Sequence, residues 1–167
     1  MEVGLSLGSN VGDRLAHLRG ARDKIGTLAG VRIVAQAPVY ETEPVGVQPE
    51  HRHISFLNTV LVLESALEPA DLQEKLAAVE EQLGRVRTAD KYAPRTLDID
   101  VLYVDELKLH SPRLTLPHPR WMQRRFVLQP LADVRSGLKL PGADVPVKDL
   151  LAALPAGEAV TLFAGKW

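Results

Sequence analysis

Asp98-Ile99-Asp100 is the strongest local chemical signal in the sequence. In a β-strand, residues i and i+2 project from the same face, so both carboxylates would point the same way. Two like charges side by side on a sheet repel each other unless a positive group lies between them. Mg²⁺ is a suitable counter-ion, because it prefers carboxylates, phosphate oxygens and water as ligands. A solvated strand face is the alternative interpretation, and an Asp-x-Asp pair alone leaves it open.

Basic residues cluster just upstream of this pair. The planar guanidinium group of arginine matches two phosphate oxygens at once. Carboxylates beside several arginines therefore suggest a metal-bound polyphosphate, whose negative charge the metal and the guanidinium groups share. Surface ion pairing is the alternative here. The cluster consists of Arg85, Arg87, Lys91 and Arg95, and a second basic run near Phe126 holds His118, Arg120, Arg124 and Arg125.

Three other motifs carry weaker signals. The segment 8–13 is rich in glycine but matches neither the Walker A loop nor Gly-x-Gly-x-x-Gly, which favours a tight turn from strand to helix. Phe56 and Asn58 share a strand face, where a ring and a carboxamide could grip a planar heterocycle. Considered alone, these two residues are better explained as core. The five histidines lack the spacing of a zinc motif.

Strands and helices must bring these residues together. Apolar and small residues alternate over 3–8, which predicts a strand that breaks at Gly8-Ser9-Asn10. Ser9 or Asn10 could cap a helix that ends at Gly30. Further strands are predicted over 31–39, 56–64 and 97–104, with a second helix from Pro69 to Gly84. In the last strand, the side chains expected to face away from the aspartates are those of Leu97, Ile99, Val101 and Tyr103.

The resulting order, β-α-β-β-α-β, predicts an α+β fold of the ferredoxin-like type. In that arrangement an antiparallel sheet is covered on one face by two helices. The pattern weakens beyond Asp105. There we expect a short hairpin near Leu107, a helical stretch over 120–128 and a short terminal helix over 147–154.

Length and composition limit the classes of protein that fit. The 167 residues correspond to one domain at about 150 residues per domain, so we expect a single domain over 1–167. Lys and Arg number 20 and Asp and Glu number 21, and this net charge of −1 argues against a general nucleic-acid binder. The absence of cysteine excludes disulfides and fits a cytoplasmic location. No run approaches the ~18 apolar residues that span a bilayer, so no membrane partner is expected.

Six segments, taken in order, resemble the hydroxymethyl-dihydropterin pyrophosphokinases, a family of folate synthesis. The most specific of them is KYAPRTLDIDVL at 91–102, which contains the aspartate pair. The other matching segments extend the resemblance through nearly the whole chain and are 7–10, 40–46, 56–58, 84–87 and 113–118. The resemblance implies a ferredoxin-like fold, in agreement with the predicted order of elements.

The resemblance also implies a reaction and its site residues. ATP would donate its terminal diphosphate to the hydroxymethyl group of 6-hydroxymethyl-7,8-dihydropterin, and AMP would leave. Asp98 and Asp100 would hold two Mg²⁺ ions, while Arg85 and Arg95 stabilise the transferred charge. ATP would be bound by Glu80, Arg87, Arg113, Thr115, His118 and Arg124. The pterin would be bound by Thr42, Val45, Phe56, Asn58, Tyr92 and Phe126, with its ring stacked between the two phenylalanines.

Three positions depart from the family's pattern. Tyr92 stands where Trp is frequent, Phe56 where Tyr is frequent, and Pro119 where an aromatic residue is common. The segment 48–55 has no close match. The expected partners are the two small substrates, and we expect a monomer. Two other functions fit the residues less well: a different metal-dependent nucleotidyl- or phosphoryl-transfer enzyme, and a non-catalytic ferredoxin-like binding module.

Overall fold

The structure is a computed structural model that describes residues 1–42, 55–85, 96–157 and 159–167. Strands interrupted by two helices occupy the first two thirds of the described chain, and mostly shorter elements follow. In chain order the elements are β1 (Glu2–Ser9), α1 (Arg14–Gly26), β2 (Val31–Gln36), β3 (Val39–Thr42), β4 (Phe56–Ser65), α2 (Pro69–Gln82), β5 (Asp98–Val104), β6 (Leu109–His110), β7 (Thr115–Leu116), the 3₁₀ turn η2 (Trp121–Gln123), α3 (Arg125–Arg135), α4 (Val147–Ala153) and β8 (Val160–Ala164).

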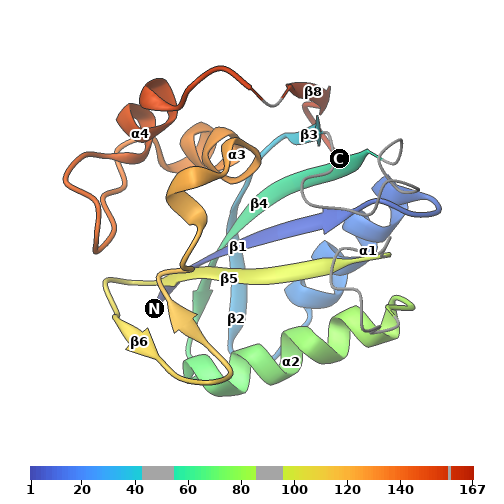
Figure 1. The fold of residues 1–167 in the computed structure, drawn as a ribbon. Helices are drawn as coiled ribbons and strands as arrows, with labels where there is room; N and C mark the ends of the chain where they lie inside the picture. Colours follow the sequence, from blue (N-terminus) through green and yellow to red (C-terminus); the bar gives the residue numbers. More distant parts are fainter. Residues whose placement is uncertain (43–54, 86–95, 158) are drawn as a thin grey trace.

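The central sheet is antiparallel and mixes strands from both ends of the chain. Its strand order is β5-β1-β4-β3-β8, and β2 also pairs with β4 (Figure 1). The long strand β4 makes this possible, because its first half pairs with β3 and its second half with β2. β1 lies between β5 and β4, so it joins the strand that carries the aspartates to the strand that carries Asn58.

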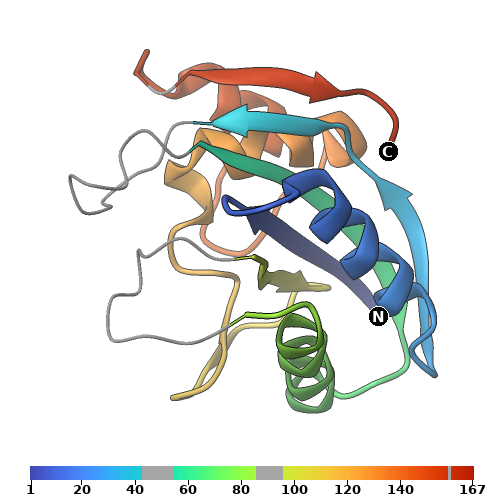
Figure 2. The same ribbon diagram turned by 90° about the vertical axis from the view of Figure 1, so that its right-hand side faces the viewer.

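Both faces of the sheet are covered, each by its own core. Helices α1 and α2 pack on one face (Figure 2), against alternate apolar residues of β1 such as Leu5 and Leu7. Helices α3 and α4 pack on the other face, where Trp121 and Leu128 meet Val60 and Val62 of β4. Since successive strand residues point to opposite faces, the small residues of β1 lie on the α3 side. The confirmed coarse architecture is therefore a mixed α/β fold with an antiparallel sheet.

Two predicted boundaries are wrong near the first helix and the second strand. β1 continues through Ser9, and the side chain that caps α1 is Asp13, whose Oδ1 accepts from the amide of Ala16 at 3.1 Å. The single strand predicted over 31–39 is two strands, because the chain leaves β2 after Gln36 and passes Pro38 before β3 begins. Proline lacks the amide hydrogen that a continuous ladder needs.

The prediction for Tyr103 is wrong for a specific geometric reason. The pairing of β1 with β5 shifts between Gly4 and Leu5, so Gly4 lies opposite Tyr103 and Leu5 opposite Val101. This β-bulge adds one residue to β5 and turns the Tyr103 side chain to the α3 side. A Cβ atom on Gly4 would lie 2.2 Å from Cε1 of Tyr103. Glycine at this position is therefore required by the ring that packs over it.

The C-terminal residues complete the far edge of the sheet. β8 pairs with β3, and the indole of Trp167 donates to the carbonyl of Ala37 at 2.7 Å. The guanidinium of Arg22 on α1 lies 5.0 Å from the centre of the Trp167 ring. Sequence patterns did not predict β8. The predicted hairpin near Leu107 lies slightly later, as the β6–β7 pair.

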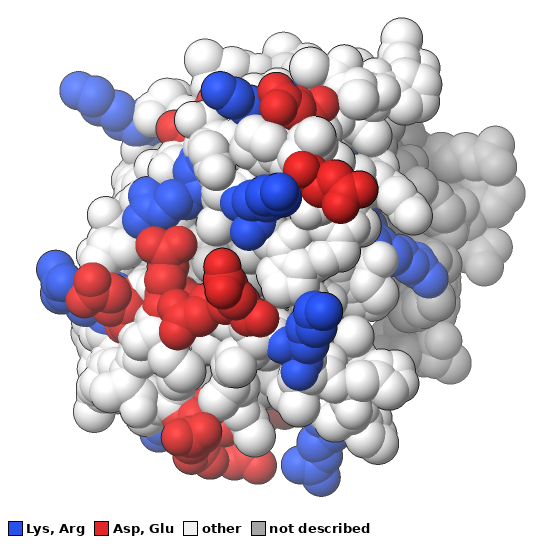
Figure 3. Space-filling model, turned by 90° about the vertical axis from the view of Figure 1, so that its left-hand side faces the viewer, with Lys and Arg blue, Asp and Glu red and all other residues white. Residues whose placement is uncertain are grey.

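Charge is mixed on the side of the molecule where β6 and α4 lie. There, acidic side chains lie in several separate groups, with Lys and Arg side chains between them (Figure 3). This agrees with the net charge of −1. No helix in the described part of the chain is long and apolar enough to span a membrane.

Candidate active site

The two aspartates and the candidate pterin residue Asn58 lie on one face of three neighbouring strands. Asp98 on β5 pairs with Gly8 on β1, and Gly8 pairs with Asn58 on β4. Asp100 pairs with Ser6 in the same way. Adjacent strands are about 4.8 Å apart, so about 10 Å separates the backbones that carry Asp98 and Asn58. Gly8, which lies between them, has no side chain that would separate the two groups.

Gly8 is a site residue whose importance the sequence reading missed. A Cβ atom there would lie 3.0 Å from Oδ1 of Asn58 and 3.6 Å from the ring of Phe56. The signal was present, because a glycine inside an alternating strand pattern often marks a close approach. The sequence pattern over 8–13 instead favours a turn at Gly8. The strand in fact continues past it to Ser9.

Arg85 connects the second helix to the carboxylate pair. Its Nη1 donates to Oδ1 of Asp98 at 2.7 Å and to Oε2 of Glu80 at 2.5 Å. Although burial alone would lower the pKa of Arg85, the negative charges of Asp98 and Glu80 raise it. A permanently charged guanidinium group is therefore fixed beside Asp98.

Glu80 is a buried carboxylate with two structural partners. It is 4% exposed, and besides Arg85 it accepts a hydrogen bond from the backbone amide of Ile99 at 2.8 Å. Ile99 is the residue between the two aspartates. In this structure Glu80 therefore holds β5 and Arg85 together, a task different from the nucleotide contact that the resemblance implied.

The environment of Asp100 opposes its ionisation. Burial and the nearby charge of Asp98 together raise the pKa of Asp100 to about 7, against the opposing effects of Arg124 and Arg85. Arg124 acts on this carboxylate from the start of α3, and Arg85 acts on it from the end of α2. A cation bound here would relieve the repulsion between the two aspartates.

His118 is held next to β5 by the backbone. Its amide donates to the carbonyl of Leu102 at 2.8 Å, two residues beyond Asp100. Burial, together with the charges of Arg124 and Arg120, lowers the pKa of His118 to about 4. Nδ1 accepts from the amide of Arg120 at 3.1 Å, which assigns the proton of the neutral ring to Nε2. The ring is thus a neutral donor at physiological pH.

The candidate pterin residues of β3 and β4 are in contact. Asn58 Nδ2 donates to Oγ1 of Thr42 at 2.6 Å, and both side chains are buried. Thr42 pairs with Phe56 across the two strands. Phe126, the second residue of α3, packs on the same side of the sheet, and the guanidinium of Arg124 lies 5.4 Å from the centre of its ring.

Some candidates are not brought to this centre or lie outside the described residues. Arg113 is 86% exposed and lies 3.9 Å from Glu74 of α2, and Thr115 is half-buried in β7. Roles for these two in nucleotide binding stay predictions. The same holds for the candidates that fall outside the described residues, which are Val45, Arg87, Tyr92 and Arg95.

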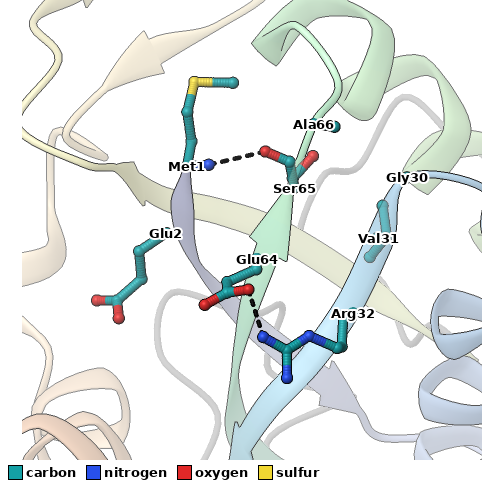
Figure 4. A pocket seen from close by; sticks show the side chains of 8 residues that line it. All are labelled: Met1, Glu2, Gly30, Val31, Arg32, Glu64, Ser65 and Ala66. Carbon is teal, nitrogen blue, oxygen red and sulfur yellow. Dashed lines mark hydrogen bonds and ion pairs between the residues drawn. The ribbon is translucent and has the colours of Figure 1, made fainter.

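A separate pocket of about 590 Å³ lies at the opposite end of the sheet, where β1 begins and β4 ends (Figure 4). Its polar groups already pair with one another. The amino group of Met1 donates to the carbonyl of Ser65 at 2.8 Å, and Arg32 pairs with Glu64 at 2.5 Å. It therefore offers little unused binding capacity, and we assign the chemistry to the aspartate face.

Comparison with known proteins identifies the family of the chain. The family model described as 7,8-dihydro-6-hydroxymethylpterin-pyrophosphokinase (HPPK) matches residues 4–136. The chain belongs to the HPPK family. It is 41% identical over 154 residues to the Pseudomonas aeruginosa 2-amino-4-hydroxy-6-hydroxymethyldihydropteridine pyrophosphokinase, a match that covers 92% of this chain and 91% of that protein. The Bacillus subtilis HPPK is 37% identical over 130 residues, covering 78% and 75% of the two chains.

Solved structures with an HPPK portion share the fold. Plasmodium falciparum HPPK-DHPS with pteroate superposes with a TM-score of 0.69 at 13% identity, over 90% of this chain. The match covers 42% of the Plasmodium chain, so this chain spans about two fifths of that larger protein. The HPPK family model ends at residue 136, so α4, β8 and Trp167 lie beyond the matched part.

Proposed function

We propose that this chain transfers diphosphate from ATP to 6-hydroxymethyl-7,8-dihydropterin, giving AMP and the dihydropterin diphosphate in tetrahydrofolate biosynthesis. The observation that carries the proposal is the shared sheet face, on which the carboxylate pair and Asn58 flank Gly8 in a member of the HPPK family. The polar end of this face suits a polyphosphate. The end lined by Asn58, Thr42 and Phe56 suits a planar heterocycle.

The carboxylate pair fits a magnesium ion. Asp98 and Asp100 would hold it, because Mg²⁺ is commonly bound by one or two carboxylates together with substrate phosphates and water. In the described part of the chain, no group of three or more His, Cys, Asp or Glu side chains gathers as a metal site. When bound, the ion would neutralise phosphate charge and polarise the phosphoryl oxygens. A second ion stays a prediction.

The basic residues would stabilise charge as the diphosphate moves. In the transfer, the hydroxymethyl oxygen forms a bond to the β-phosphorus and loses its proton, while the bond to the oxygen that leaves with AMP breaks. Arg85 is fixed by Glu80 and Asp98, so it needs no rearrangement to face the phosphoryl oxygens. Arg124 supplies a second positive charge near Asp100, and His118 donates from Nε2 as a neutral ring.

The pterin would bind at the β3–β4 end of the face. The amide of Asn58 offers both a donor and an acceptor to the heterocycle's hydrogen-bonding edge. Thr42 fixes the orientation of that amide through the 2.6 Å hydrogen bond. Phe56 and Phe126 supply the ring surfaces for stacking, and the cation–π contact of Arg124 steadies Phe126.

We further infer that the core is ferredoxin-like and forms one domain. The strand order β5-β1-β4 followed by β2 and β3 supports this arrangement, as do the two helices α1 and α2 on one face. Strands β2, β4 and β5 contribute side chains to both cores, which supports a single domain. A monomer and a cytoplasmic location stay predictions, and size-exclusion chromatography with light scattering tests the first.

The decisive experiment identifies the products. Purified protein is incubated with ATP, MgCl₂ and 6-hydroxymethyl-7,8-dihydropterin and followed by ³¹P NMR and by chromatography of the nucleotides. AMP should accumulate with one equivalent of pterin diphosphate, and only when both the pterin and Mg²⁺ are present. ADP, free phosphate or pterin-independent turnover would overturn the proposal.

A further inference from the structure

Arg14, the first residue of α1, joins three elements at the edge of the pterin end. Its Nη2 pairs with the carboxylate of Glu41 on β3 at 2.8 Å. Its Nη1 donates to the carbonyl of Ser55 at 3.0 Å. Its guanidinium also lies 5.7 Å from the centre of the Phe163 ring on β8. One side chain thus ties β3, the start of β4 and the C-terminal strand to α1.

Each polar partner of Arg14 is the immediate neighbour of a candidate pterin residue. Glu41 precedes Thr42, and Ser55 precedes Phe56. Glu41 pairs with Leu57, which belongs to the core beneath α1, so the Glu41 side chain points to the helix side of the sheet. The alternation of strand side chains then places Thr42 on the opposite face, with the aspartates. Arg14 therefore contacts β3 on the face of the sheet opposite to the one that carries Thr42 and the aspartates.

The position matters because it adjoins Thr42 and Phe56, the outermost pair of the β3–β4 ladder that the structure describes. A tertiary contact at such a pair limits its local opening. A single exposed ion pair would add little to the stability of this strand end. Arg14 does more, since its planar group is half-buried and engages a carboxylate and a backbone carbonyl at the same time.

We propose that Arg14 is a positioning residue that fixes the spacing of Thr42 and Phe56 and so sets the affinity of the site for the pterin. The proposal rests on the proposed function. The strand β8, which contributes Phe163 to the same contact, lies beyond the part of the chain that the HPPK family model matches. The carboxylates of β5 are separated from this edge by β1 and β4, so the site for the nucleotide's phosphates is unaffected.

The test compares Arg14→Gln with Arg19→Gln, which removes the same charge from an exposed position on the same helix. The dissociation constant of the pterin is measured by calorimetry with a non-hydrolysable ATP analogue and Mg²⁺ present, and the KM values of both substrates are measured separately. Arg14→Gln should weaken pterin binding about tenfold, the loss expected for one charged hydrogen-bond anchor. The KM for ATP should change less than about twofold, and Arg19→Gln should match the wild type.

A second variant keeps the test valid if Arg14→Gln folds poorly. Glu41→Ala removes the carboxylate partner without touching α1 and should weaken pterin binding in the same direction, whereas Glu41→Gln, which keeps an acceptor oxygen, should restore most of it. Equal pterin affinity in the Arg14 and Arg19 variants would overturn the inference, and so would a loss of kcat at unchanged pterin affinity. If the wild type itself forms no AMP with the pterin, the proposed function fails instead.

Discussion

The carboxylate of Glu80 accepts a hydrogen bond from the backbone amide of Ile99 at 2.8 Å, directly between the two aspartates. The same Oε2 atom accepts from Arg85 at 2.5 Å. A buried group on α2 thereby sets both the path of β5 and the place of the guanidinium that faces Asp98. Such a buried anion is costly unless its partners satisfy it, so the three groups depend on one another.

Glu80→Gln should lower kcat by about 10- to 100-fold, because the amide keeps the shape but loses the charged hydrogen bond that holds Arg85. The thermal midpoint should fall as well, since Arg85 then lacks one of its two carboxylate partners. Steady-state kinetics and calorimetric unfolding measure the two effects. Glu81→Gln, at the exposed next position of the same helix, is the matched control. A wild-type kcat in Glu80→Gln would contradict the role assigned to Glu80.

Asp98→Asn and Asp100→Asn should each reduce activity by about a thousandfold or more, since both remove charge that the transferred diphosphate requires through the metal. The fold should survive. The pKa of Asp100 is about 7 because burial and Asp98 oppose its ionisation, so above pH 7 the neutral asparagine removes a repulsion. Asp100→Asn should therefore unfold at an equal or higher temperature than the wild type at pH 8. Asp144→Asn, at an exposed position, is the control, and an unfolded Asp100→Asn protein would indicate a structural role.

His118 should make stability depend on pH below neutrality. Its folded pKa is about 4, whereas the ordinary value is 6.5, so the unfolded chain binds a proton more readily between these values. The contribution of the neutral ring is complete above pH 6.5 and is lost as the pH falls toward 4. His118→Gln should therefore lose less stability than the wild type between pH 7 and pH 5. Urea unfolding at the two pH values gives the comparison, and parallel curves for both proteins would refute it.

Gly4→Ala should lower the free energy of unfolding by about 1–3 kcal/mol, the usual cost of forcing extra volume into a packed site. The added methyl group would meet the ring of Tyr103, which is 1% exposed and held by a 2.8 Å hydrogen bond to Glu2. Gly26→Ala is the control, because its Cβ would meet only the tip of Ile33 at 3.7 Å. Adding Tyr103→Leu to Gly4→Ala should recover part of the loss. Simple additivity of the two changes would argue against the contact.

The order of the main elements and the shared face of Asp98 and Asp100 were predictable from periodicity. Strand and helix patterns are local, and β1, β4, α2 and β5 are long enough to display them. The bulge at Tyr103 was not predictable, because it depends on how β1 and β5 register with each other. β8 was missed for a similar reason, since a short strand gains its structure from β3, more than a hundred residues earlier.

The sequence predicted the chemical groups of the site better than it predicted the residues that hold those groups in place. Resemblance to the family correctly indicated the family itself and drew attention to the aspartates, Arg85 and Asn58, whose placement on adjoining strands supports those assignments. It did not indicate the buried bridge of Glu80 or the triple contact of Arg14. Those contacts join residues distant in the chain, so no local pattern encodes them.

The alternation along β1 has a consequence for how this protein tolerates change. Val3, Leu5 and Leu7 supply cohesion beneath α1 and α2, while Ser6 and Gly8 leave the opposite face nearly free of bulk. One face of the sheet therefore contributes most to the stability of the fold, and the opposite face determines which ligand binds. Substitutions at Phe56, which lies on the open face beside Gly8, should therefore change which ligands bind while lowering the free energy of unfolding only slightly.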